Sequence, residues 1–223
     1  MSFNFCIEIE MKMISKFQNS WLQIPADDYE GHMSDENVRQ QQALNEIFKN
    51  VLAEYSPESL CVLGCTTGNG FEHINMQVTK RVVGVDINRE YLEILHNRFG
   101  TQIPGMKLIC DDLNELDLPA ASFDLIHAAL LFEYVDVEKI LNKISKWLKK
   151  DGVLSVVLQL PSDKSTPVSE TPYQSLKLLS PILNLVNPDM FSSSANKAGL
   201  KEVKGFEYDL KTGKKFFVAY FSA

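Results

Sequence analysis

The chain has 223 residues, of which 45% are hydrophobic, and it carries a formal net charge of −7. This length fits one domain or a domain with an appendage, and the apolar share is ample for a buried core. The 22 basic residues are dispersed among 29 acidic ones, which argues against a nucleic-acid backbone as a partner. No apolar run reaches 18 residues, so we expect no membrane-spanning helix and no membrane partner.

The cysteines and the first residues bear on the compartment. The four cysteines have no histidine or cysteine partner at metal-ligand spacing, so neither a metal site nor dependence on a disulfide is expected; they are Cys6, Cys61, Cys65 and Cys110. The start of the chain lacks the basic and apolar regions of a signal peptide. Together these features predict a cytoplasmic protein.

The first quarter of the chain is expected to precede the main domain. Apolar residues alternate strictly from Phe3 to Met11, which predicts a strand or an extended arm, with a floppy extension as the alternative. Apolar residues at helical spacing over 34–54 predict a helix with Ser34 as its N-cap. Residues 1–56 are therefore interpreted as an arm and a helical cap, and 57–223 as the main domain.

Strand and helix patterns alternate through the main domain. Strands are predicted at 60–64, 82–86, 107–110, 123–129 and 152–159, and helices at 69–77, 88–98, 136–149 and about 190–199. Such alternation predicts an α/β fold with a parallel sheet and right-handed crossovers. Two last strands, 201–210 and 216–221, are joined by a short glycine-containing link, which predicts a β-hairpin.

An insert at about 160–190 follows the fifth strand of this pattern. It contains a polar loop and then an apolar stretch over 176–186. Ligands of open α/β sheets bind beyond the carboxyl ends of the strands, where this insert begins. It is therefore interpreted either as a cover for a substrate or as a surface loop with a packing helix.

A glycine-containing turn links the first two strands of the main domain. The apolar run at 60–63 meets the small-residue turn at 64–70, and the next apolar run ends in Asp86, 18 residues after Gly68. This order of strand, turn, helix and second strand is typical of a nucleotide-binding unit. An acid at the end of the second strand, roughly 20 residues after the glycine turn, can accept hydrogen bonds from a ribose. The glycines at 64, 68 and 70 do not have the GxGxxG spacing of dinucleotide sites, which disfavours a nicotinamide cofactor.

Four segments in this order resemble class I S-adenosylmethionine-dependent methyltransferases, of the small-molecule type similar to methyltransferase domains 11 and 25. They are the turn at 64–70, the strand ends at 84–87 and 108–113, and the stretch from 122 to 135. The C-terminal hairpin also matches the arrangement of that family. The resemblance implies a Rossmann-like doubly wound sheet of seven strands, mostly parallel, with an antiparallel C-terminal hairpin strand.

The resemblance also implies S-adenosyl-L-methionine as cofactor, with S-adenosyl-L-homocysteine as its product. The methionine part would lie against the turn backbone and receive its ammonium contacts from carbonyls at Gly64 and near the fourth strand's end. The residues implied for that part are Gly64, Cys65, Thr66, Gly68 and Ala128.

The nucleoside part would lie at the ends of the second and third strands. Asp86 would accept hydrogen bonds from the ribose hydroxyls, and Ile87 would pack on the adenine. Asp111 would accept from the adenine amine, while the N–H of Asp112 or Leu113 would donate to the ring edge; a carboxylate suits an amine because charge-assisted hydrogen bonds are the stronger ones.

Two positions depart from the family pattern. Val62 stands where the family usually carries an acid, and Thr66 stands where it usually carries glycine, which permits a positive φ. Both departures point to weak cofactor binding or to a non-catalytic relative.

Four side chains are candidates for contact with the methyl acceptor. A base is needed only if the acceptor must lose a proton, because holding donor and acceptor in line can provide most of the acceleration. The candidates are Tyr29, His32, Glu133 and Tyr134. His32 could act as a base near neutral pH, although an isolated histidine in a loop is more often a surface residue; His127 is expected to be a packed histidine in a strand.

The expected function is S-adenosylmethionine-dependent methyl transfer to a small-molecule substrate. The alternatives are a degenerate methyltransferase-fold module that binds partners without catalysis and, with less support, a nicotinamide-dependent oxidoreductase. The residues identify neither the acceptor nor the oligomeric state.

Overall fold

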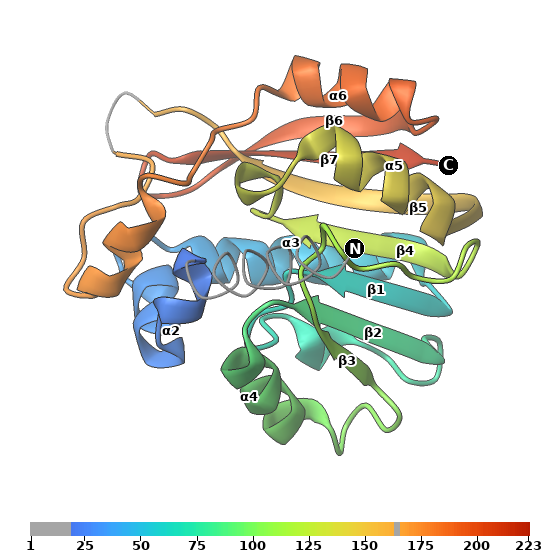
Figure 1. The fold of residues 1–223 in the computed structure, drawn as a ribbon, viewed down its shortest axis with the longest axis horizontal. Coiled ribbons are helices and arrows are strands. Elements are labelled where there is room, and N and C mark those ends of the chain that lie inside the picture. The colour runs from blue at the N-terminus through green and yellow to red at the C-terminus, as the bar shows by residue number, and fades with distance from the viewer. Residues whose placement is uncertain (1–18, 163–165) are drawn as a thin grey trace, which may run out of the picture.

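The computed structural model describes residues 19–162 and 166–223 of the chain. They form a seven-stranded sheet in the order β3-β2-β1-β4-β5-β7-β6, with helices on both faces (Figure 1). This topology confirms the predicted fold class. The strand or arm predicted over residues 3–11 lies outside the described residues.

The strands of this sheet run in one direction, except for β7, which runs opposite to them. β7 is antiparallel to both β5 and β6, and it lies between them. The carboxyl ends of the first four strands therefore meet at one edge of the sheet. The strands are β1 (Ser59–Leu63), β2 (Arg81–Asp86), β3 (Lys107–Cys110), β4 (Phe123–Ala129), β5 (Leu148–Gln159), β6 (Lys201–Asp209) and β7 (Lys215–Ser222).

Five α-helices and four short 3-10 helices accompany the sheet in the described part of the chain. The α-helices are α2 (Ala26–Ser34), α3 (Gln40–Tyr55), α4 (Arg89–Phe99), α5 (Val137–Trp147) and α6 (Pro188–Lys197). The 3-10 helices are η1 (Ser20–Gln23), η2 (Phe71–His73), η3 (Phe132–Tyr134) and η4 (Gln174–Leu179). Within the described residues, none of these helices is long and apolar enough to cross a membrane.

Each face of the sheet buries a separate apolar cluster. On one face, α3 and α4 pack against alternate residues of the central strand, including Leu60 and Val62. On the other face, α5 and α6 pack against Cys61 and Leu63. All five residues of β1 are buried, as expected for a strand covered on both sides.

The prediction of a helix at 69–77 is wrong. Only the three residues of η2 are helical there. Gly68 and Gly70 both have positive φ, +92° and +86°, which takes the backbone out of the right-handed helical region. A Cβ at Gly70 would lie 2.7 Å from the Phe48 ring, so the turn is pressed against α3.

The helix predicted over 34–54 is real but begins later. Ser34 is the last residue of α2, and α3 starts at Gln40 after Arg39, whose φ is +54°. Most of α3 lies on the face of the sheet, because its buried stripe, including Ile47, Phe48 and Val51, belongs to the core. The element that lies over the strand ends is α2 instead (Figure 1).

The boundary between α5 and β5 also differs from the prediction. The helix ends at Trp147 rather than 149, and β5 begins at once with Leu148. The register with β4 shifts between Phe123 and Leu125, opposite this early part of β5. Asp151 has a φ of +64° there, so the predicted helix stop is an irregularity within a strand.

The insert after β5 docks on α2. The Nδ1 atom of His32 lies 2.9 Å from the Thr171 hydroxyl, and the Ser175 hydroxyl donates to Asp28 at 2.5 Å. The ring of Tyr173 lies over Gly31, where an added Cβ would be only 2.1 Å from it. The absence of a side chain at Gly31 is therefore what permits this close packing.

We predict that Gly31→Ala weakens the docking of the insert, although alanine normally stabilises a helix interior by roughly 1 kcal/mol relative to glycine. The new methyl group must displace the Tyr173 ring. Urea unfolding of Gly31→Ala, Tyr173→Ala and the double variant would measure the coupling. Gly31→Ala should be destabilising alone and stabilising in the Tyr173→Ala background; the same sign in both backgrounds would contradict the packing argument.

Candidate functional site

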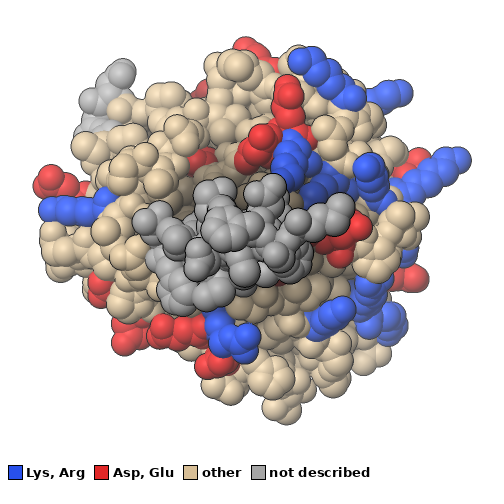
Figure 2. Space-filling view, in the orientation of Figure 1, with Lys and Arg blue, Asp and Glu red and all other residues tan. Residues whose placement is uncertain are grey.

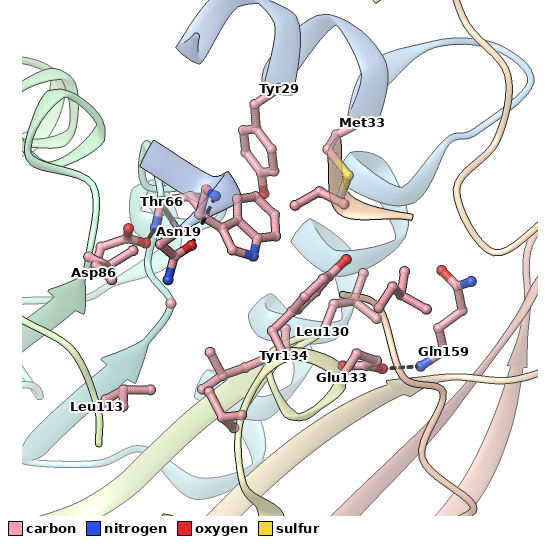
Figure 3. Close-up of a pocket in the computed structure, with 18 of the residues that line it drawn as sticks. Asn19, Tyr29, Met33, Thr66, Asp86, Leu113, Leu130, Glu133, Tyr134 and Gln159 are labelled. Carbon is pink, nitrogen blue, oxygen red and sulfur yellow. Dashed lines mark hydrogen bonds between the residues drawn. The ribbon is translucent and has the colours of Figure 1, made fainter. Parts of the chain in front are cut away.

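A cavity opens at the carboxyl ends of β1 to β4 (Figure 3). η1 and α2 form one wall, η3 lies at its base, and η4 of the insert contributes Leu176 and Leu179. All four candidate acceptor-contacting residues, Tyr29, His32, Glu133 and Tyr134, line this cavity.

The turn after β1 brings part of its backbone to the cavity. Gly64 and Thr66 line it, with φ values of +67° and +46°. A β-branched residue rarely adopts such a φ, so Thr66 holds a strained conformation that its N–H bond to Asp86, at 2.9 Å, helps to fix. Cys65 is instead buried in the core, and Gly68 lines a separate polar cleft beside Arg98.

β4 ends at Ala129 as predicted, but the residues that line the cavity there begin one position after the expected Ala128. Ala128 is buried in the core cluster, whereas Ala129 and Leu130 line the cavity. Leu130 has a φ of +50°, and its N–H donates to the Val157 carbonyl at 2.9 Å. Backbone at 129–130, not at Ala128, therefore faces the cavity.

Asp86 ends β2 with its carboxylate in the cavity wall. One carboxylate oxygen accepts from the Thr66 N–H and the other from the Asn88 N–H, both at 2.9 Å. Burial raises the pKa of Asp86 to about 6, against the lowering effect of those backbone N–H groups. Each oxygen accepts one bond here and can take a second, as two ribose hydroxyls require.

The end of β3 presents a second group of polar atoms. Asp111, Asp112 and Leu113 all line the cavity, as does Ile87 at the end of β2. The Asp112 N–H already donates to the Asp111 carboxylate at 2.9 Å. Of the two predicted donors to a bound ring, the Leu113 N–H is therefore the one left available.

An aromatic group from the N-terminal segment closes the cavity above these strand ends. Trp21 makes edge contacts with Tyr134 and Tyr29, with ring centroids 5.1 and 6.1 Å apart. The Asn88 side chain donates to the Trp21 carbonyl at 3.1 Å, which fixes η1 to the start of α4. Trp21 and the neighbouring Asn19 were not predicted, because they precede the segments that carry the family resemblance.

Glu30 fastens α2 to the strand ends. It accepts from the Thr67 hydroxyl at 2.5 Å and pairs through both oxygens with the Arg98 guanidinium of α4. The hydrogen bond from Arg98 lowers the pKa of Glu30, so this carboxylate stays ionised. No sequence pattern indicates this contact, because it joins residues 68 positions apart.

Glu133 lies at the base of the cavity with 2% of its surface exposed. One carboxylate oxygen accepts from the Gln159 N–H at 2.7 Å, as Figure 3 shows. Its Oε2 atom is buried and has no hydrogen-bond partner among the described residues. Burial raises the pKa of Glu133 from 4.5 to about 7.

The pKa values of Tyr29 and His32 make both residues weaker candidates for a base than Glu133. Burial raises the pKa of Tyr29 to about 12, so its hydroxyl stays protonated. His32 lies in α2 rather than in a loop and is 4% exposed. Burial and the neighbouring Lys214 lower its pKa to about 4, which makes it a weaker proton acceptor than Glu133 at neutral pH.

Two residues outside the cavity behave as core residues. His127 stacks on Phe48 with ring centroids 4.6 Å apart and lies 3.0 Å from the Ser155 hydroxyl, which confirms it as a packed histidine. Val62 is buried in the apolar cluster beside α3 and does not line the cavity. In the described part of the chain, no three histidine, cysteine or acidic side chains are grouped to hold a metal ion.

Comparison with known proteins agrees with this geometry. Residues 61–156 match the family model described as "Methyltransferase domain". They are the part of the chain that is similar to class I S-adenosylmethionine-dependent methyltransferases. The match spans the turn, Asp86, Asp111 and Glu133, and it leaves α2, the insert and the hairpin outside. No curated protein matches the chain.

Solved structures share the fold at low sequence identity. An S-adenosylmethionine-dependent methyltransferase from Mesorhizobium loti has a TM-score of 0.64 at 16% identity, over 80% of this chain and 96% of that one. A putative sarcosine dimethylglycine methyltransferase from Galdieria sulphuraria has 0.63 at 14%, over 81% and 85%. The [4+2]-cyclase SpnF has 0.63 at 13%, over 81% of each chain.

The unpartnered Glu133 carboxyl predicts a pH-dependent stability. Its folded pKa of about 7 exceeds its ordinary 4.5, so the folded state binds more protons between these values. The contribution of Glu133 to stability should fall as pH rises from about 4.5 to above 7, by an order of 3 kcal/mol. Glu133→Gln, which removes the charge, should raise the melting temperature at pH 8 and leave it nearly unchanged at pH 4.5.

Glu138→Gln on the exposed side of α5 is the matched control, because its carboxylate is 68% exposed. It should alter the melting temperature little at either pH. A Glu133→Gln effect of equal size at pH 4.5 and pH 8 would show that ionisation of Glu133 carries no penalty on folding.

Proposed function

We propose that this protein binds S-adenosyl-L-methionine and transfers its methyl group to a small, mainly apolar molecule. The observation that carries the proposal is the Asp86 carboxylate, which is held by two backbone N–H groups at the wall of the cavity. The strand-end acid, the glycine turn and the second acid at β3 all line one cavity, as an adenosine-containing ligand requires.

The residues present fit this cofactor. Asp86 has acceptor capacity for two ribose hydroxyls, and Ile87 and Leu113 offer apolar surface for the adenine. Gly64, lacking a Cβ, leaves backbone open to the methionine part; a Cβ there would also press on Leu131 at 3.3 Å. When bound, the cofactor supplies a methyl group activated by the positive charge on its sulfur.

The rest of the cavity supports a small acceptor with substantial apolar surface. Leu130, Leu176, Leu179 and Leu183 line it together with Met33, and the insert lies against α2. Such a lining excludes water and holds an acceptor in place, which favours in-line transfer. Tyr29 and Tyr134 stay protonated because burial raises the pKa of both, so each can donate a hydrogen bond that orients a ligand.

The partner proposed is thus a small molecule rather than a nucleic acid. Basic and acidic side chains are mixed on the face drawn in Figure 2, and the described part of that face offers no continuous basic stripe. We further infer a cytoplasmic site of action from the cysteine usage of the sequence.

A second candidate is a methyltransferase-fold module that binds the cofactor without transferring its methyl group. The strained backbone at Thr66 favours weak or altered binding of the methionine part. SpnF is a [4+2]-cyclase, so this fold also serves other chemistry in that protein. Cofactor binding without methyl transfer to any acceptor would favour this alternative.

We predict that S-adenosylmethionine and S-adenosylhomocysteine bind the full chain and that NAD does not. The glycine spacing and the strand ends fit one adenosine, not a dinucleotide. Isothermal titration calorimetry with the three ligands under identical conditions would test this. NAD binding tighter than either sulfur compound would overturn the proposal.

Asp86→Asn should weaken S-adenosylhomocysteine binding by about 2 kcal/mol, or roughly thirtyfold. The amide keeps the shape but offers one acceptor oxygen in place of two, while its NH₂ faces a backbone N–H. Asp124→Asn is the control, because Asp124 bonds Ser59 and Lys149 away from the cavity. Equal affinity in wild type and Asp86→Asn would place the ribose elsewhere.

A further inference from the structure

The buried Oε2 atom of Glu133 is an acceptor without a donor among the described residues. Burying a carboxylate is costly unless each oxygen is hydrogen-bonded and the charge is balanced. In Glu133 only one of the two oxygens is hydrogen-bonded, by the Gln159 N–H at 2.7 Å, and Oε2 is not. A glutamine could accept that same bond, so the structural contact alone does not require a charged residue.

The surroundings fix this carboxylate in place without neutralising it. The Gln159 side chain accepts from Gln40 at 2.9 Å and donates to the Pro167 carbonyl at 2.9 Å, so its amide is committed elsewhere. The Glu133 carbonyl accepts from the Asn184 N–H at 2.9 Å, which fixes η3 against the insert. Within 19–162 and 166–223, no lysine, arginine or histidine forms an ion pair with Glu133.

Glu133 lines the apolar part of the cavity, and its free oxygen is closed off from solvent there. Glu133 shares that part with leucines of the insert and with the ring of Tyr134, and Figure 3 places it between Tyr134 and Gln159. A neutral hydroxyl there would satisfy the oxygen but leave its charge uncompensated. An ammonium would donate a hydrogen bond to the oxygen and also balance its charge. Such a charge-assisted hydrogen bond gains strength in apolar surroundings.

We propose that the methyl acceptor is a primary or secondary amine on an apolar body, and that Glu133 Oε2 binds its nitrogen. The role of the amine as methyl acceptor rests on the proposed function, whereas the binding contact does not. Once paired, the ammonium passes one proton to Oε2: an N–H bond breaks, an O–H bond forms, and the nitrogen regains its lone pair. Burial favours this neutral pair, in keeping with a Glu133 pKa of about 7.

Benzylamine, benzyl alcohol and benzyltrimethylammonium are the probes that test this contact. They share an apolar ring and differ in charge and in the presence of a donor. Calorimetry with the wild-type protein should rank benzylamine first, because it alone brings both a positive charge and an N–H. No benzylamine binding up to about 10 mM, or an equal or higher affinity for either other probe, would overturn the proposal.

Glu133→Gln then assigns the contact to the residue. The amide retains an acceptor for the Gln159 N–H but turns an NH₂ group toward the amine. Benzylamine affinity should fall at least tenfold and benzyl alcohol affinity less than threefold, while Glu138→Gln alters neither. An equal loss for the amine and the alcohol, or no loss for the amine, would overturn the assignment; the wild-type ranking needs no variant to fold.

S-adenosylhomocysteine binding is measured on the same samples and separates the two proposals. It should be the same in wild type and Glu133→Gln, because Asp86, not Glu133, is assigned to the cofactor. An amine site in a protein that does not bind S-adenosylhomocysteine would overturn the proposed function and the role of the amine as methyl acceptor, and would leave the contact with Glu133 standing. Cofactor binding without amine selectivity would overturn the present inference alone.

Discussion

Asp86 at the end of β2 joins the ends of β1 and β3, and these are three of the strand ends on which the cavity is built. Its two carboxylate oxygens accept from Thr66, in the turn after β1, and from Asn88, at the start of α4. Its main-chain carbonyl accepts from Asp111, just after β3, at 3.1 Å. The residue assigned to the ribose thus also shapes the surface around it, since an acceptor buried at 8% exposure must be satisfied from nearby backbone.

A second set of shared polar contacts organises the other end of the cavity. The Pro167 carbonyl of the insert accepts from Gln159 and from the buried Lys214 amine, both at 2.9 Å. Gln159 in turn holds Gln40 of α3 and, through its N–H, Glu133. Insert, hairpin, β5 and α3 therefore meet in one buried network, in which Glu133 Oε2 is the atom left open.

Local patterns explain how much could be predicted from the sequence. The central parallel strands were predictable because they bury runs of apolar residues, and the hairpin because a short glycine-containing link joins two strand-like runs. Strand-end positions such as Asp86 and Asp111 follow from the strand boundaries. The helix expected at 69–77 failed because two left-handed glycines and contact with Phe48 override a short helical pattern. Ala128 was expected at the site but is buried in the core, because the chain leaves the strand only after Ala129, at Leu130 with its positive φ.

Long-range contacts explain what the sequence could not provide. Trp21, Glu30 and Gln159 reach the site through hydrogen bonds to residues far along the chain, and no spacing rule connects them. The burial of His32 beneath the insert likewise depends on Thr171, 139 positions away. Burial and Lys214, which is distant along the chain, lower its pKa, so that shift could not be inferred from an isolated histidine in a polar stretch.

α2 is attached by an ion pair on one side and by hydrogen bonds and packing on the other, and these two attachments respond differently to salt. Toward the turn after β1 and toward α4, α2 is held by Glu30, which accepts from Thr67 and pairs with Arg98; the side chains of Glu30 and Arg98 are 23% and 45% exposed. Toward the insert it is held by hydrogen bonds and by the Tyr173 ring packed over Gly31. Added salt screens the partly exposed ion pair and leaves the packed side largely unaffected. High ionic strength would therefore loosen α2 from one end, so that the helix pivots on the insert.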